Sequence, residues 1–279
     1  MKKIIFSAIV AASVFVSCGE SVESKADALL QQAVTAYETA DYQTAKILVD
    51  SMRTAYPTAV DSRRSALSLM RKVEIAEQQR SLNHCNEMLS TLKSERDSLL
   101  QGFLYEKDAR FQSEGSYIVP SQSNNLNVYN SFLRARVTES GTAYLTSLYR
   151  GKAIAHKGVK VSAGESFASC DKAFSSRTYR NLGMNNERLD FVYGEDGGII
   201  DFISAAQNSQ ITVELSGSKS KYSYVLRADD AKAIARIAEL SRLLKSIVEY
   251  ENMAAEAKRH IEFVERTRER FMSDSIVMK

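Results

Sequence analysis

Apolar residues recur with helical spacing along two long stretches of the chain. From Leu82 to Phe103 they return at alternating intervals of three and four residues, which places them on one stripe of a helix. Residues 231–272 carry a similar stripe with one register shift. We therefore expect a first helical arm at 61–115 and a return arm at 228–273 that pair antiparallel. The residues expected to form the pairing are Leu82, Leu89, Leu92, Leu99, Phe103, Leu240, Leu244, Ile247, Ile261 and Val264.

Two residues interrupt the first stripe. Arg96 occupies an apolar position and is expected to pair with Glu251 or Glu256 of the return arm. Gly102 costs about 1 kcal/mol relative to alanine inside a helix, so it predicts a bend or break there. The arms can pair within one chain or between two chains. Similar arm lengths on either side of the middle segment favour pairing within one chain, and a homo-oligomer stays open.

Between the arms, residues 116–227 follow the period of two that is typical of strands. Glycines at 139–141 and 194–198 mark two hairpin loops. The predicted fold class is α+β, with helical arms flanking an inserted all-β domain that is a sandwich or barrel-like. The strands predicted in this β head are 132–138, 142–150, 159–162, 188–193, 199–203, 211–215 and 222–226.

Residues 26–60 form a candidate helical hairpin. The positions of Leu29, Ala33, Tyr42, Ala45 and Pro57 resemble one tetratricopeptide repeat, in which small residues let two antiparallel helices approach closely. One repeat cannot bury its apolar face alone. The hairpin is therefore expected to pack against the following helix of its own chain, or else to dock a peptide.

The N-terminus has the layout of an export signal. Two lysines precede an apolar run that ends before Cys18, and the run is too short to span a bilayer. Residues 15–18 resemble the lipobox of bacterial lipoproteins, with Phe15 where leucine is usual. The resemblance implies that 1–17 is removed, that Cys18 is acylated, and that 18–25 is a tether. The alternative is an ordinary signal cleaved nearby. Residues 274–279 are expected to fray.

Composition and charge narrow the function classes. The chain of 279 residues is 44% hydrophobic and 25% charged, which is ordinary for a folded protein. Its formal net charge of +3 includes two leader lysines, and the return arm mixes both signs. No basic surface for nucleic acid is therefore expected. Cys85, on the apolar stripe, and Cys170 are expected to be free thiols.

Catalytic motifs are not evident. His84, His156 and His260 lie in different segments, and no serine elbow or phosphate-binding glycine loop occurs. We expect no enzyme activity, no metal site and no cofactor; Glu195 and Asp196 alone are a poor calcium site. Candidate ligand or partner residues in the β head are the strand neighbours Tyr222 and Tyr224, and the arginines Arg177, Arg180 and Arg188 near a polar loop at 175–186.

These expectations favour a non-enzymatic, lipid-anchored protein of the cell envelope. A helical stalk would present the β domain, and the protein would act as a scaffold or adaptor among other envelope proteins. The anchor is expected in the outer membrane, with the face left open. The alternative is a surface or periplasmic binding module whose β head recognises a glycan or peptide.

Overall fold

The structure, a computed structural model, describes residues 21–123, 130–181 and 183–277, with side chains up to 267. The predicted signal at 1–17 and Cys18 lie outside these residues. The described chain combines helices with two antiparallel sheets, which confirms the α+β class. It divides into two compact units: residues 1–82 with 256–279, here called the helical unit, and residues 83–255, here called the β unit.

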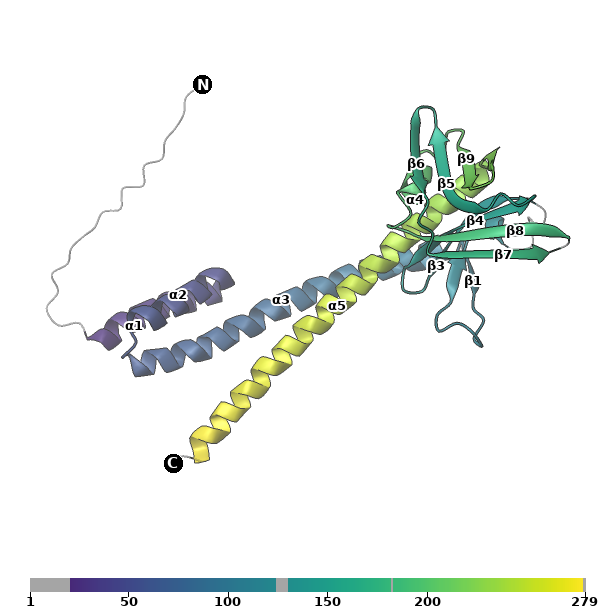
Figure 1. Cartoon of the computed structure of the whole chain (residues 1–279). Coiled ribbons are helices and arrows are strands. Elements are labelled where there is room, and N and C mark those ends of the chain that lie inside the picture. Colours follow the sequence, from purple (N-terminus) through teal and green to yellow (C-terminus); the bar gives the residue numbers. More distant parts are fainter. Residues whose placement is uncertain (1–20, 124–129, 182, 278–279) are drawn as a thin grey trace, which may run out of the picture. The chain divides into compact units, whose positions relative to one another are not determined.

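The helical unit begins with two helices that lie side by side, α1 (Val22–Glu38) and α2 (Tyr42–Ala55) (Figure 1). Ala33 and Ala45 are completely buried, so small side chains sit where the helices approach. Ala40, in the turn, has a left-handed φ of 60°. Asp41 then caps α2 by accepting a hydrogen bond from the Thr44 N–H at 3.1 Å.

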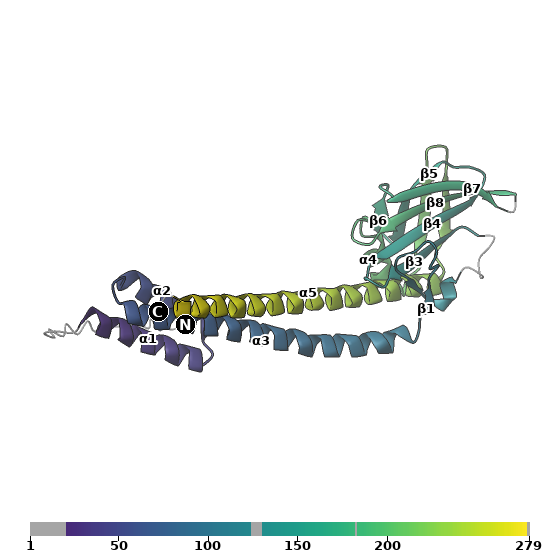
Figure 2. The same ribbon diagram turned by 90° about the horizontal axis from the view of Figure 1, so that it is seen from below.

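The hairpin packs on the beginning of α3 (Val60–Leu100), and Figure 2 shows these helices from below. Glu23 of α1 ties the two together, because its carboxylate accepts hydrogen bonds from the Ser62 N–H at 2.7 Å and the Ser62 hydroxyl at 2.8 Å. These bonds lower the pKa of Glu23. The helix α1 starts at Val22, so four residues of the expected tether are helical. The shared apolar cluster consists of Ala26, Leu30, Ala33, Ala45, Val49, Met52, Ala59, Ala66, Leu69 and Val73.

The β unit contains two open sheets, so the barrel alternative is wrong. The strand order of the first sheet is β1 (Leu104–Glu106), β2 (Ser116–Ile118), β3 (Phe132–Thr138), β4 (Ala143–Gly151), β8 (Met184–Val192) and β7 (Ser175–Asn181). The strand order of the second is β10 (Lys221–Val225), β9 (Thr212–Gly217), β5 (His156–Ala163) and β6 (Ser166–Cys170). A short 3-10 helix, η1 (Pro120–Gln122), and the helix α4 (Ile199–Ala205) complete the unit.

One hydrophobic core joins both sheets to α4 and to the first half of α5 (Ala228–Val277). Leu145 and Phe191 of the first sheet, Leu215 of the second, Ile203 of α4 and Ile237 of α5 have no exposed surface. Alternate residues of β3 face this core, because side chains alternate between the faces of a strand. The core therefore covers only one face of the first sheet, which we call the inner face.

Three predicted elements were wrong. Residues 199–203 form α4 rather than a strand. The Asp196 carboxylate, two residues before the N-cap Gly198, accepts a hydrogen bond from the Ile200 N–H at 2.7 Å and so satisfies a backbone donor of the first helical turn. The predicted polar loop 175–186 contains the edge strand β7 and the start of β8. The first arm, predicted to reach residue 115, ends at Leu100, just before the helix-breaking Gly102.

The two long helices run antiparallel within the β unit. Lys93 of α3 forms an ion pair with Glu251 of α5 at 2.7 Å. Arg236 precedes Glu251 on α5, and its guanidinium lies 4.7 Å from the centre of the ring of Phe103, which follows the C-terminal end of α3. Arg96 instead pairs with its neighbour Asp97, so its predicted pairing with the return arm was wrong.

The residues predicted to pair the helices are buried to different degrees. Leu240, Leu244 and Ile247 are buried in the β unit, as are Leu82 and Val264 in the helical unit. The half-buried members are Leu89, Leu92, Leu99, Phe103 and Ile261. The helix α5 continues to Val277, beyond the predicted end at 273. Within the described residues, none of the helices combines the length and apolar character needed to span a bilayer.

Candidate functional site

The face of the first sheet that points away from the core is rich in arginine. Residues paired across neighbouring strands point to the same side. The pairs Arg134 with Thr146, Thr146 with Asp190, and Arg188 with Arg177 therefore lie on one face. Leu133 and Leu145 are on the other face, in the core. We call this surface the arginine face; its arginines are Arg134, Arg136, Arg150, Arg177 and Arg188.

The arginine face contains a hollow of about 320 Å³. Its lining includes Glu106, Gln112, Phe132 and the arginines Arg134, Arg136 and Arg188. An adjoining hollow of about 530 Å³ shares Glu106, Gln112 and Arg136 with it. We call the first of these the arginine hollow. Three guanidinium groups and one carboxylate line it, so its wall carries an excess of positive charge.

Aromatic rings hold two of these arginines in place. The Arg134 guanidinium lies 4.0 Å from the centre of the Phe132 ring, and that of Arg136 lies 4.4 Å from the centre of the Tyr144 ring. Stacking engages the face of a guanidinium and leaves its N–H groups, which lie in its plane, available to acceptors. Burial lowers the pKa of Arg134, and the nearby Asp230 carboxylate acts against that shift.

The arginines of the hollow differ in how their charge is compensated. Arg188 forms a two-pronged ion pair with Asp190, with Nε–Oδ2 at 3.0 Å and Nη2–Oδ1 at 2.8 Å. Thr146 donates a hydrogen bond to the same carboxylate at 2.5 Å. Arg136 donates a hydrogen bond to the Ser116 hydroxyl at 3.2 Å and forms no ion pair with any described residue. Arg136, unlike Arg188, is therefore available to an anionic ligand in the hollow.

The structure separates the arginines that the sequence grouped. Arg177 pairs with Arg188 and lies on the arginine face, whereas Arg180 pairs with Asn185 on the opposite face of the same strand. Arg134 and Arg136 were not among the site residues predicted from the sequence. Their alternation with Leu133, Ala135 and Val137 in a predicted strand was the available signal, since every second residue shares a face.

The tyrosines of β10 belong to a separate cluster. The Tyr222 ring centre lies 5.9 Å from that of Tyr224 and 5.3 Å from that of Tyr149 in the first sheet. Tyr222 is 40% exposed. The Tyr224 hydroxyl is buried, and this burial raises its pKa. Tyr222 is therefore the tyrosine of β10 that is more accessible to a ligand.

A buried serine and histidine connect the two sheets. The Ser147 hydroxyl lies 2.9 Å from His156 Nε2, and His156 Nδ1 lies 3.2 Å from the Ser216 carbonyl oxygen. Because a carbonyl only accepts, Nδ1 carries the proton and Ser147 donates to Nε2. The order of groups resembles a nucleophile and its base. However, Ser147 has no exposed surface, so we interpret the pair as a structural bond within the core.

The acidic turn at 194–198 has a local structural role. The Asp196 side chain is 1% exposed, and it accepts hydrogen bonds from the Gly194 N–H at 3.2 Å as well as from Ile200. These bonds direct its oxygens at the backbone of the turn and of α4. The Asp196 carboxylate is therefore not available to bind a cation at the surface together with Glu195.

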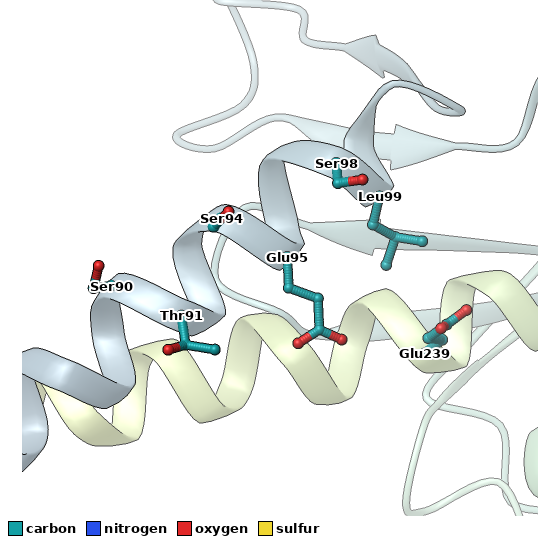
Figure 3. Close-up of a pocket in the computed structure, with 7 residues that line it drawn as sticks. All are labelled: Ser90, Thr91, Ser94, Glu95, Ser98, Leu99 and Glu239. Atoms are coloured by element: carbon teal, nitrogen blue, oxygen red, sulfur yellow. The ribbon is translucent and has the colours of Figure 1, made fainter.

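A second concave surface lies between α3 and α5 within the β unit (Figure 3). The close-up shows the Glu95 side chain directed from α3 toward α5, where Glu239 is located. Ser90, Ser94 and Ser98 follow one another at intervals of four along α3, and their side chains are short and polar. Two carboxylates and a row of hydroxyls are typical of a solvated helix surface, so the arginine hollow is the stronger candidate site.

Comparison of the chain with protein-family models, with curated proteins and with solved structures finds no match.

Proposed function

We propose that this protein is a non-enzymatic, lipid-anchored cell-envelope protein that acts as an adaptor, and that its β unit holds an anionic partner on the arginine face. Acylated Cys18 would provide the anchor. In this proposal the two sheets form a sandwich, and α3 and α5 act as antiparallel, coiled-coil-like arms. The shared core of both sheets and the Lys93–Glu251 ion pair support these assignments.

The observation that carries the proposal is the number of arginines on one sheet face. They come from four neighbouring strands, β3, β4, β8 and β7. A solvated sheet face usually mixes both signs, whereas here five arginines accompany Asp190, which already pairs with Arg188, and Glu106 on the edge strand β1. Clustered cations on one surface attract a partner of opposite charge and orient its approach. The surface therefore suits an acidic region of another envelope component.

A comparison of two charge reversals tests the adaptor proposal. Arg177→Glu introduces an acid on the arginine face, and Arg180→Glu introduces the same acid on the opposite face of the same exposed strand. The full chain and both variants would be purified from membranes after cross-linking, and the co-purifying proteins compared. We expect Arg177→Glu to lose partners that Arg180→Glu retains. Equal recovery of partners by both variants would contradict the proposal.

A second candidate function is recognition of a glycan or peptide by the β unit. Two observations favour it: the arginine hollow has the volume of a small-ligand site, and Tyr222 presents an exposed ring beside Tyr149 and Tyr224. In this case the helical arms would only display the β unit. The two candidates differ in the ligand expected: an envelope protein for the first, and a small molecule or short chain for the second.

A further inference from the structure

The two hollows on the arginine face meet at three shared residues. Glu106 comes from β1, Gln112 from the loop after β1, and Arg136 from β3. Small-ligand sites commonly have volumes of about 300–1,000 Å³. The arginine hollow, at about 320 Å³, accommodates one ring-sized group, and the adjoining hollow leaves room for a connected second group. A ligand that occupies both hollows would contact all three shared residues, so these residues indicate its chemistry.

Arg136 indicates the charge of the ligand. Its guanidinium is stacked on Tyr144, donates to Ser116 and has no ion-pair partner among the residues that the structure describes. A stacked guanidinium has fewer accessible orientations and so loses less freedom when it binds a ligand. Its planar fork of N–H donors matches the two oxygens of a carboxylate. The ligand is accordingly expected to contain a carboxylate.

Glu106 and Gln112 indicate what else the ligand contains. Glu106 is exposed on β1, and its carboxylate can only accept hydrogen bonds. The Gln112 side-chain oxygen already accepts a hydrogen bond from the Asp108 N–H at 2.9 Å, so its amide nitrogen remains to donate. A ligand with hydroxyl groups satisfies both, because a hydroxyl donates to Glu106 and accepts from Gln112. An acidic protein side chain has no hydroxyl to donate to Glu106.

We propose that the arginine hollow binds a sugar residue that carries a carboxylate, of the hexuronic acid class. Arg136 binds the carboxylate, and Glu106 and Gln112 bind ring hydroxyls. This inference rests on the second candidate function, in which the β unit is a recognition module. An acidic protein partner suits the outer part of the arginine face better, where Arg177 is exposed on the edge strand β7.

Calorimetric titration of the full chain in detergent micelles tests the proposal. The probes are an oligogalacturonate, a neutral glucose oligomer of the same length, and hexaglutamate. We expect the oligogalacturonate to bind at least about tenfold more tightly than the other two, because only it combines a carboxylate with hydroxyls. Arg136→Gln should weaken its binding by about tenfold or more, since the charge-assisted bond is lost.

Three further variants make the result specific. Arg180→Gln is the matched control on the opposite face of the sheet and should leave binding unchanged. Glu106→Gln, at an exposed position, should weaken oligogalacturonate binding by a smaller factor without affecting the fold. Tyr222→Ala should have no effect. Circular dichroism of each variant shows whether it remains folded.

Several outcomes would overturn the proposal. These are no binding of oligogalacturonate by the folded wild-type chain, equal binding of the neutral oligomer, and equally tight binding of hexaglutamate. Loss of binding in Tyr222→Ala but not in Arg136→Gln or Glu106→Gln would place the ligand at the tyrosine cluster instead. None of these outcomes affects the recovery of envelope partners by Arg177→Glu and Arg180→Glu, so the adaptor proposal is tested separately.

Discussion

At the scale of single residues, His156 is the titratable group whose environment most directly links pH to folding. It is 7% exposed, and both its ring nitrogens are engaged, by Ser147 and by the Ser216 carbonyl. Burial lowers its pKa below the ordinary value of 6.5. The neutral ring accepts a hydrogen bond from the Ser147 hydroxyl at Nε2. In the protonated ring both nitrogens are donors, so this hydrogen bond from Ser147 is lost. Protonation therefore opposes the folded state.

The stability of the β unit should consequently fall as the pH decreases below about 6.5. Below pH 6.5 the unfolded chain binds a proton at His156, whereas the folded chain does not until the pH reaches the lowered pKa. The free energy of unfolding therefore decreases between pH 6.5 and that lower pKa. Urea unfolding between pH 7.5 and 5.5 measures this loss. His156→Gln should reduce the dependence on pH, and His260→Gln, at an exposed position, should preserve it. The same dependence in both variants would contradict the assignment.

At the scale of elements, the first half of α5 is part of the core of the β unit. Ile234, Ile237 and Leu240 have no exposed surface, and they belong to the same cluster as Leu133 and Leu145 of the first sheet. Ser241 also donates a hydrogen bond to the Gly141 carbonyl in the β3–β4 turn at 2.6 Å. The first half of α5 therefore packs into the same core as both sheets and α4.

Leu240→Ala should destabilise the β unit by about 2–5 kcal/mol, because it leaves a cavity in a packed core. Chemical denaturation followed by circular dichroism measures the change. Val248→Ala is the control on the same helix, at a side chain 38% exposed, and should cost less than about 1 kcal/mol. Equal effects of the two substitutions would show that α5 does not depend on this core.

At the scale of the whole molecule, each unit has its own apolar cluster, and the proposed anchor, Cys18, precedes α1 in the sequence. Acyl chains bind membranes in proportion to their length, at about 0.8 kcal/mol per buried methylene. In the proposed function, acyl chains on Cys18 would hold the protein at the membrane in this way.

The full chain expressed in bacteria should therefore be recovered in the membrane fraction, and Cys18→Ala should shift it to the soluble fraction. Cys170→Ala, which removes a thiol in the β unit, is the control and should remain with the membranes. Fractionation followed by immunodetection measures the distribution. Persistence of Cys18→Ala in the membrane fraction would refute the lipid anchor.

Local patterns in the sequence were sufficient for several elements. The strand predicted at 132–138 coincides with β3, and the loop at 139–141 connects it to β4 as expected. The stripe containing Leu240, Leu244 and Ile247 is buried as its helical spacing indicated. These features depend on the spacing of apolar residues along one segment, which the sequence contains directly.

The tertiary structure decided what depends on contacts between distant segments. Residues 199–203 are apolar enough for a strand or a helix, and the hydrogen bond from the Ile200 N–H to Asp196 together with burial of Ile203 favours the helix. The arginine face arises because β3, β4, β8 and β7 become neighbours in one register, which no local pattern specifies. A shift of one residue in that register would turn Arg177 or Arg188 to the opposite face, so the candidate site exists only in the assembled sheet.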